Sequence, residues 1–138
     1  MNRPIYEAPE HVSEELKVAS YICNVFSCSY EQYPPLHPLN GKLVQDGATK
    51  VVAEIKIRNN ASTKYPTLMM SSDKWKRGLD WAFIENKPFM LFVKFTDGIF
   101  MTKVKSKYDE AIGGRTDRND PNDVERCVYI PISSFKKI

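Results

Sequence analysis

The segment VVAEIKIRNN, residues 51–60, constrains the fold more than any other stretch of the chain. Its valines and isoleucines predict a buried β-strand. Side chains two positions apart on a strand share a face, so Glu54 and Lys56 must point into the same volume. A solvated ion pair on an exposed face would explain this arrangement without any function. The alternative is that the strand delivers an acid and an amine to one site.

Composition indicates one domain and leaves the partner open. The chain has 138 residues, 42% of them hydrophobic, and we expect a single domain over 1–138. A net charge of +3 permits a nucleic-acid partner without requiring one. The 3 Cys and 2 His lack the spacing of zinc ligands, which favours free thiols. No secretory signal and no apolar run of ~18 residues is present, so we expect a cytoplasmic protein with no membrane segment.

The predicted elements mix helices and strands. They are a helix over 13–26 capped by Ser13, a hairpin of 40–44 and 48–58 around a turn at 45–47, a helix from Ser71 or Ser72 to 86, a hairpin of 87–95 and 98–105, a polar loop over roughly 106–126, and a short strand at 126–132. Hydrophobic residues at helical spacing should face the core; they are Leu16, Ala19, Cys23 and Phe26, then Trp75, Leu79, Ala82 and Phe83. This order predicts a mixed α/β sheet flanked by helices.

An acid and an amine on one strand suit phosphodiester chemistry. Metal-dependent nucleases use two carboxylates to hold Mg²⁺, and a lysine that serves the attacking water and neutralises charge in the transition state. Glu-x-Lys supplies the second carboxylate and the amine, and the first carboxylate normally comes from the preceding antiparallel strand. Alone this motif is a weak signal, because unrelated strands contain it by chance.

Further motifs occur in a matching order through most of the chain. They are EELKVA (14–19), FSCSYEQYP (26–34), AEIKIRNN (53–60), YPTLMMSSDKWKRGL (65–79), PFMLFVKFTDGIFMTKV (88–104) and GGRTDRNDPNDVERCVYIPISSFKKI (113–138). In these motifs the chain resembles the PD-(D/E)XK nuclease superfamily, and more closely a group of small phage-type proteins of that fold.

The resemblance implies a restriction-endonuclease-like core in the order α-β-β-β-α-β. It implies a deoxyribonuclease that uses Mg²⁺ or Mn²⁺ and acts on DNA in a bacterial or phage-infected host cell. The implied catalytic and metal-binding residues are Glu54, Lys56, Asn40 and Glu15, with the backbone carbonyl of Ile55 as a further metal ligand. A homodimer or higher homo-oligomer is also compatible with this family, because a duplex has two strands to cut.

Asn40 departs from the family pattern, which has an Asp followed by Gly at this position. Asn has the shape of Asp without its charge, so binding of a hard divalent cation should weaken sharply. Either the natural protein has lost the acid, or the chain carries a deliberate Asp→Asn change, and the sequence leaves both open. We expect a nuclease by descent whose activity is impaired in this chain.

Asp46 is the alternative source of the missing acid. It lies in the Gln-Asp-Gly turn, where Asp and Gly suit turn conformations, so a structural role is favoured. The number of residues in the hairpin loop decides which face of the sheet position 40 lies on. A three-residue loop closed by a Gly bulge puts Asn40, Glu54 and Lys56 on one face, whereas a two-residue loop turns Asn40 away. The resemblance favours the first geometry.

Three residues are candidates for contact with DNA. Lys74 and Ser72 begin the second helix, where a cation and free backbone N–H groups suit a phosphate. Arg58 follows the central strand and either contacts the DNA backbone or pairs with a nearby acid. Lys74 could equally be a solvated residue of the helix surface.

Other conspicuous residues are expected to be structural. Trp75 and Trp81 suit the core or its rim, and His37 suits a structural role, because the family assigns the proton transfer to the lysine. The alternating charges of 115–125 predict a loop tied by ion pairs, or a gate or subunit contact.

Two other functions remain open at this stage. One is a non-catalytic DNA-binding or assembly module on the same fold. The other is an adaptor or inhibitor that acts on a host protein, because a fold alone does not fix a function.

Overall fold

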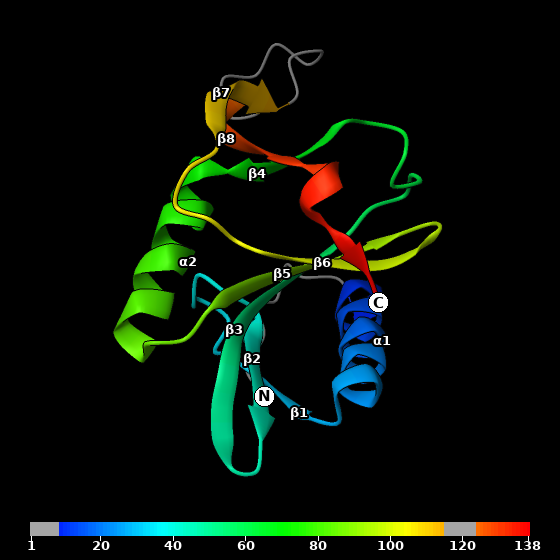
Figure 1. Cartoon of the computed structure of the whole chain (residues 1–138), viewed down its shortest axis with the longest axis vertical. Coiled ribbons are helices and arrows are strands. Elements are labelled where there is room, and N and C mark those ends of the chain that lie inside the picture. Colours follow the sequence, from blue (N-terminus) through cyan, green and yellow to red (C-terminus); the bar gives the residue numbers. More distant parts are fainter. Residues whose placement is uncertain (1–8, 115–123) are drawn as a thin grey trace.

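In the computed structural model, which describes residues 9–114 and 124–138, a six-stranded mixed sheet lies between two helices (Figure 1). The elements are α1 (Pro9–Phe26), β1 (Ser29–Gln32), β2 (Gly41–Gln45), β3 (Ala48–Ile57), β4 (Thr67–Ser71), α2 (Ser72–Glu85), β5 (Phe89–Phe95), β6 (Gly98–Lys103), β7 (Asp109–Gly114), β8 (Val124–Pro131), the 3₁₀ helix η2 (Ile132–Ser134) and β9 (Lys136–Lys137).

The large sheet has the strand order β1-β2-β3-β5-β6-β9, in which β3 and β5 are parallel and the other neighbours are antiparallel. A second, antiparallel sheet has the order β4-β8-β7. The predicted mixed α/β sheet flanked by helices is confirmed. With β4 assigned to the second sheet, the chain follows the expected α-β-β-β-α-β order from α1 to β5. Neither helix in the described ranges has the length and hydrophobicity needed to cross a lipid bilayer.

Residues of β3 alternate between two hydrophobic cores on opposite faces of the large sheet. Ala53 and Ile55 pack with α1, whereas Val52 packs with α2 and the second sheet. Glu54 and Lys56 have the parity of Val52, so they point toward α2 and the second sheet. The central strand therefore sends both side chains into the layer between the large sheet and α2.

The hairpin of β2 and β3 has a shorter turn than expected, but Asn40 still lies on the same face of the sheet as Glu54. The turn contains two residues, Asp46 and Gly47, both with positive φ, because Gln45 pairs with Ala48. A two-residue turn alone would direct Asn40 to the wrong face. The register then shifts between Leu43 and Val44, so that Lys50 has no partner on β2. This bulge shifts the pairing by one residue, so that Asn40 lies opposite Glu54 and not opposite Ala53.

The buried face of α1 is offset from the predicted stripe. The helix begins at Pro9, so the expectation that Ser13 caps it is wrong. Leu16 is 39% exposed and Phe26 is 38% exposed, and the helix instead buries Glu15 beside the stripe of Val18, Ala19 and Ile22. The sequence contains two overlapping apolar patterns at helical spacing, and only packing against the sheet selects between them.

Helix α2 begins and ends with capping residues. The Ser71 hydroxyl accepts a hydrogen bond from the Lys74 N–H, and Asn86 ends the helix in the left-handed conformation. Trp75 and Ala82 are buried as predicted, but Phe83 is 86% exposed, contrary to its predicted core position. Close packing of the helix on β5 occurs instead at Gly78, where an added Cβ would lie 2.5 Å from the Phe89 ring.

Several strands were not predicted. β1, β4 and β7 are short and carry polar or mixed sequences, so they lack a clear alternation of apolar residues. The expected polar loop over 106–126 is wrong in part, because β7 occupies 109–114 and β8 begins at Val124. The predicted ion-paired loop over 115–125 falls largely outside the described residues.

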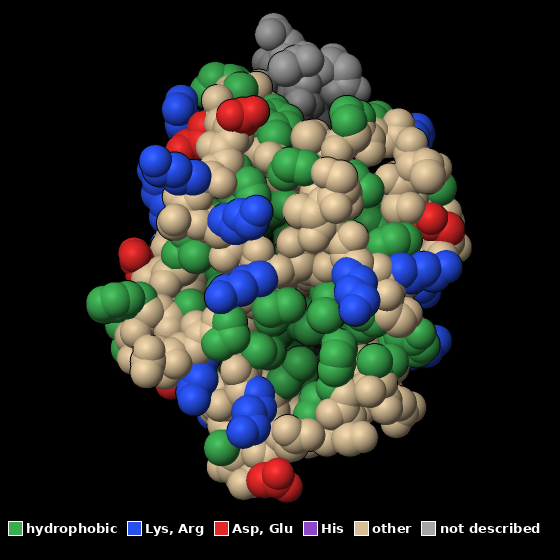
Figure 2. All heavy atoms as spheres, in the orientation of Figure 1, with side chains coloured by type: hydrophobic (Ala, Val, Ile, Leu, Met, Phe, Trp, Pro, Cys, Tyr) green, Lys and Arg blue, Asp and Glu red, His purple; other side chains and the backbone are tan. Residues whose placement is uncertain are grey.

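Helix α1 leaves part of its sheet face uncovered. A hollow of about 340 Å³ lies there, with apolar walls that include Phe26, Leu43, Val51, Met90, Phe92 and Met101. Figure 2 shows this hydrophobic hollow, with Lys and Arg side chains around it. The hollow lies on the α1 side of β3, opposite to the face that carries Glu54 and Lys56.

Candidate active site

Asn40 links the start of β2 to the middle of β3. Its backbone N–H donates to Glu54 Oε1 at 3.2 Å, and its side-chain Oδ1 accepts from the Ile55 N–H at 2.6 Å. The β2–β3 ladder ends beside this point, because Gly41 pairs with Ala53 and is the first residue of β2. The Asn40 side chain therefore continues the strand pairing by one step and is held in a fixed orientation.

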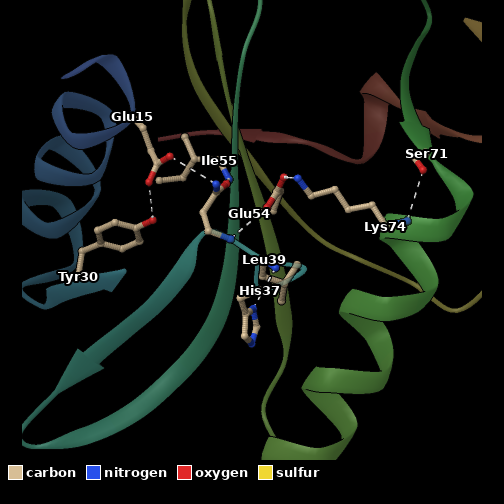
Figure 3. Close-up of polar contacts among 9 residues, drawn as sticks. Glu15, Tyr30, His37, Leu39, Glu54, Ile55, Ser71 and Lys74 are labelled. Atoms are coloured by element: carbon tan, nitrogen blue, oxygen red, sulfur yellow. Dashed lines mark hydrogen bonds and ion pairs between the residues drawn. The ribbon is translucent and has the colours of Figure 1, made fainter. Parts of the chain in front are cut away.

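Glu15 reaches the same place from α1 (Figure 3). Its carboxylate Oε1 accepts from Asn40 Nδ2 at 3.4 Å, and its Oε2 accepts from the Tyr30 hydroxyl at 3.0 Å and from Gln32 Nε2 at 3.1 Å. The side chain is 7% exposed, so these donors compensate a charge that burial would otherwise make costly. Tyr30 and Gln32 share one face of β1, which positions both of them over the helix.

Lys74 contacts Glu54 from the opposite side. Its ammonium forms a short ion pair with Glu54 Oε2, and Figure 3 shows the side chain extending from the first turn of α2 toward β3. Glu54 is 2% exposed, whereas the Lys74 side chain is 36% exposed. Lys74 was predicted either to contact a phosphate or to be a solvated residue of the helix surface; in this structure it compensates the charge of the central carboxylate.

Lys56 lies two residues beyond Glu54 on β3, and its side chain is on the same face of the sheet. Burial lowers the pKa of its ammonium from 10.5 to about 8; the nearby Glu54 opposes this shift, and Lys74 and Arg58 add to it. At neutral pH the ammonium is charged, but it releases its proton more readily than an ordinary lysine. An amine of this kind is able to neutralise a developing negative charge, or to accept a proton when it is neutral.

The oxygen atoms of this cluster fit a hard divalent cation only in part. The carboxylates of Glu15 and Glu54 are suitable ligands. Ile55 adds its backbone carbonyl, because the N–H and C=O of one strand residue point to the same edge and β2 has ended there. Asn40 does not fit as oriented: its oxygen is engaged by the Ile55 N–H, and its Nδ2 donates toward Glu15.

Within the part of the chain that the structure describes, a third acid does not join the cluster. Among residues 9–114 and 124–138, no group of three or more His, Cys, Asp or Glu side chains lies close enough to hold a metal ion. Asp46 is no substitute, because it occupies the turn at the far end of the hairpin, about 25 Å along β3 from Glu54. Among the described residues the cluster thus holds two acids, Glu15 and Glu54, with the neutral Asn40 between them.

The two other predicted DNA contacts have different environments. Arg58 is partly buried beside the site, and burial lowers the pKa of its guanidinium while Glu54 opposes this effect. Ser72 is 4% exposed, and its hydroxyl donates to Glu110 Oε2 at 3.0 Å. The Ser72 hydroxyl therefore faces the second sheet, and contact of Ser72 with DNA through the backbone N–H groups of the helix N-terminus stays a prediction.

The aromatic residues occupy the structural positions predicted for them. Trp75 is 5% exposed and donates to the Lys105 carbonyl, and Trp81 donates to the Tyr33 hydroxyl. His37 stacks on Tyr33 with ring centroids 3.9 Å apart, and its Nδ1 accepts from the Leu39 N–H. Burial is the main cause that lowers the pKa of His37, which suits a neutral packing residue.

Sequence reasoning missed Tyr30 and Gln32, which support Glu15. Their spacing of two residues in the segment Ser-Tyr-Glu-Gln is a signal of a strand with one polar face, but four residues are too few to separate from a loop. The direct pairing of Lys74 with Glu54 was also missed, because it joins two elements whose relative position depends on the second sheet.

Comparisons with known proteins identify a family and a similar fold. Residues 1–138 match the family model described as "Phage putative PDDEXK endonuclease". Among solved structures, the chain is similar to Hjc, a Holliday junction resolvase of Archaeoglobus fulgidus, an archaeal hyperthermophile. The two share 12% sequence identity with a TM-score of 0.61, over 90% of this chain and 88% of that chain, which is a likeness of fold. A search of curated proteins found no match. The family predicted from the motifs is thus confirmed, and the chain belongs to the phage PDDEXK endonuclease family.

Proposed function

We propose that the chain is a metal-dependent DNA nuclease by descent, with a metal site weakened by Asn40. The observation that carries this proposal is the convergence of Glu15, Asn40 and Glu54 at the end of the β2–β3 ladder, with Lys56 one step away on the same face as Glu54. Family membership supports nuclease chemistry. The metal, its identity and the roles of individual residues are our inference.

Glu15, Glu54 and the Ile55 carbonyl are the groups that would hold Mg²⁺ or Mn²⁺. Such an ion would polarise the phosphodiester and its attacking water. Lys56 would orient that water through its ammonium, and it would stabilise the charge that develops on the phosphate oxygens. Its lowered pKa also makes the neutral amine accessible as a proton acceptor at mildly alkaline pH.

Lys74 and Arg58 would hold the DNA backbone. Both are cations beside Glu54, and Lys74 projects from a helix N-terminus, where backbone N–H groups favour an anion. A phosphate at this position would compete with Glu54 for the Lys74 ammonium. Binding should weaken as salt rises, because each neutralised phosphate releases counterions.

One chain presents one such site, whereas a duplex has two strands. We therefore propose a second copy of the chain as a partner for cleavage of both strands. Sedimentation with and without DNA tests this point, and a monomer in both conditions would contradict it.

A cleavage assay tests the main proposal. Linear and closed circular DNA are incubated with the wild-type chain and with Asn40→Asp, in Mg²⁺ or Mn²⁺ and then in EDTA. We expect cutting by Asn40→Asp that EDTA stops and that adding Lys56→Ala to Asn40→Asp abolishes. Cutting of the linear DNA but not of the closed circle would identify an enzyme that requires DNA ends. Absence of metal-dependent cutting by Asn40→Asp would contradict the proposal.

A non-catalytic DNA-binding module is the second candidate, and a specific contact favours it. Glu15 already accepts hydrogen bonds from Asn40, Tyr30 and Gln32, and Glu54 already pairs with the Lys74 ammonium, so both acids have protein partners without an added cation. Retention of DNA without cutting, by both the wild-type chain and Asn40→Asp, would support this candidate over the first.

A further inference from the structure

A cavity of about 420 Å³ opens beside Arg58, just after the end of β3 that carries Lys56. Its walls come from the segment after β3, from β4 and β8, and from the end of β5. The lining includes Arg58, Tyr65, Met69, Phe95 and Tyr129. The volume falls within the range of about 300–1,000 Å³ that is typical of small-molecule sites.

Strand β3 leads from Lys56 to this cavity. Arg58 directly follows β3 and lies two residues beyond Lys56, so it is about 6–7 Å farther along the direction of the strand. Arg58 lines the cavity together with Tyr129 of β8, which places the cavity next to Lys56.

The lining has the chemistry of a nucleobase site. Tyr65, Tyr129 and Phe95 supply aromatic surface, and the remaining wall is largely apolar, as suits a flat aromatic ligand. Tyr65 is 55% exposed, with Lys64 Nζ 5.4 Å from its ring centroid, so a cation accompanies the aromatic ring at the rim. Arg58 adds a positive charge to the lining, which suits the phosphate attached to such a base.

We propose that this cavity, the Tyr65–Tyr129 pocket, binds an unpaired nucleobase of the DNA strand whose phosphate occupies the active site. This inference rests on the proposed nuclease function and narrows its substrate class to DNA with an unpaired nucleotide at a frayed end, overhang or branch. A base in a continuous duplex is stacked and paired, so it reaches the pocket only at the cost of unstacking. The pocket therefore favours DNA in which that cost has already been met.

The test compares two DNA duplexes in EDTA, which prevents cleavage. One is blunt and fully paired, and the other carries a short single-stranded overhang with the fluorescent base 2-aminopurine at its first unpaired position. We expect tighter binding of the overhang duplex by the wild-type chain, with quenching of the 2-aminopurine on binding. Affinity is measured by fluorescence anisotropy at fixed salt, because phosphate contacts make affinity salt-dependent.

Tyr65→Ala removes the aromatic wall at an exposed position, and thermal unfolding of the variant verifies its fold. We expect a loss of roughly 5- to 100-fold in affinity for the overhang duplex, while affinity for the blunt duplex stays within about 2-fold. Tyr65→Phe should retain stacking and quenching. Tyr21→Ala, at another exposed tyrosine whose hydroxyl contacts Ile138, is the matched control and should leave both affinities unchanged.

The outcomes separate the two proposals. If the wild-type chain binds both duplexes equally, or if Tyr65→Ala leaves the overhang affinity intact, the pocket does not bind a base, and the proposed nuclease function is untouched. If the chain binds neither duplex at low salt, the pocket and the DNA-directed function fail together.

Discussion

Lys74 at the start of α2 forms an ion pair with Glu54 at the centre of β3. The contact joins the helix to the large sheet at the point where Asn40 and Glu15 also meet. Glu54 is almost completely buried, so its charge depends on these partners. The same carboxylate is the proposed metal ligand, and Lys74 is the proposed phosphate contact. Stability and function thus compete for one ammonium group.

Lys74→Met should destabilise the protein because it leaves the Glu54 carboxylate buried with one partner fewer. We expect a loss of about 1–3 kcal/mol in the free energy of unfolding at pH 7, moderated by the partial exposure of the Lys74 side chain. Urea denaturation measures this loss. Lys76→Met, on an exposed position of the same helix, is the control and should change stability by less than about 0.5 kcal/mol. Equal effects of the two variants would show that the ion pair contributes nothing to stability.

Asn40→Asp should make stability depend on divalent cations. The substitution replaces the Nδ2 that donates to Glu15 with a carboxylate oxygen, which sets two negative charges 3.4 Å apart. We expect a loss of about 1–3 kcal/mol in EDTA, recovered when Mn²⁺ or Mg²⁺ binds the folded state. Melting temperature with and without metal measures both effects. Asn24→Asp, on the exposed side of α1, should show neither. A cation-independent melting temperature for Asn40→Asp would rule out a restored metal site.

Lys56 should lower stability at neutral pH. Its folded-state pKa of about 8 lies below the ordinary value of 10.5. Between these two pH values the unfolded chain retains a proton that the folded chain has released, so wild-type stability from this group rises with pH across that window. Lys56→Met removes the titration and should be more stable than wild type at pH 7, by about 1–3 kcal/mol.

The advantage of Lys56→Met should shrink as the pH rises from about 8 toward 10.5. Urea denaturation at a series of pH values follows it, with the exposed Lys94→Met as the control. A constant difference between Lys56→Met and wild type over this range would mean that the folded-state pKa of Lys56 is not lowered.

Gly41→Ala should disturb the site through β1. A Cβ at Gly41 would lie 2.5 Å from the Glu31 carbonyl oxygen and 2.6 Å from the Tyr30 ring, whose hydroxyl donates to Glu15. We expect a loss of about 2–4 kcal/mol, because backbone must move as well as a side chain. Gly47→Ala is the comparison: it has positive φ and no neighbouring atom, so it should lose only about 1 kcal/mol through backbone strain. The order of the two losses, measured by thermal unfolding, is the test.

The sequence predicted the parts of the fold that are set by local periodicity. Strand β3, helix α2 and the β5–β6 hairpin have strong apolar patterns, and the structure places them close to their expected bounds. The convergence of Glu54, Asn40 and Glu15 was also anticipated, although from the family resemblance and not from periodicity. The loop geometry assumed for Asn40 was wrong, since the turn has two residues and the bulge lies at Lys50.

The rest depended on tertiary structure. The second sheet joins β4, β7 and β8, which are distant in sequence, and polar segments such as 109–114 gain their strand conformation only through this pairing. Lys74 meets Glu54 because this sheet and α2 close over β3, a relation that no local pattern encodes. The exposure of Phe83 likewise reflects which side of α2 the sheet left uncovered.

The unpaired Lys50 constrains how this hairpin is able to change its length. Deleting that residue would leave the pairs on both sides of it unchanged, with Asn40 still opposite Glu54, and would remove only the bulge. Adding two residues at the tip, around Asp46 and Gly47, would lengthen the hairpin and leave the inward side chains inward. Descendants of this chain should therefore be able to lose Lys50 and keep the site, whereas the loss of one residue from 41–43 would move position 40 opposite Ala53, whose side chain faces α1.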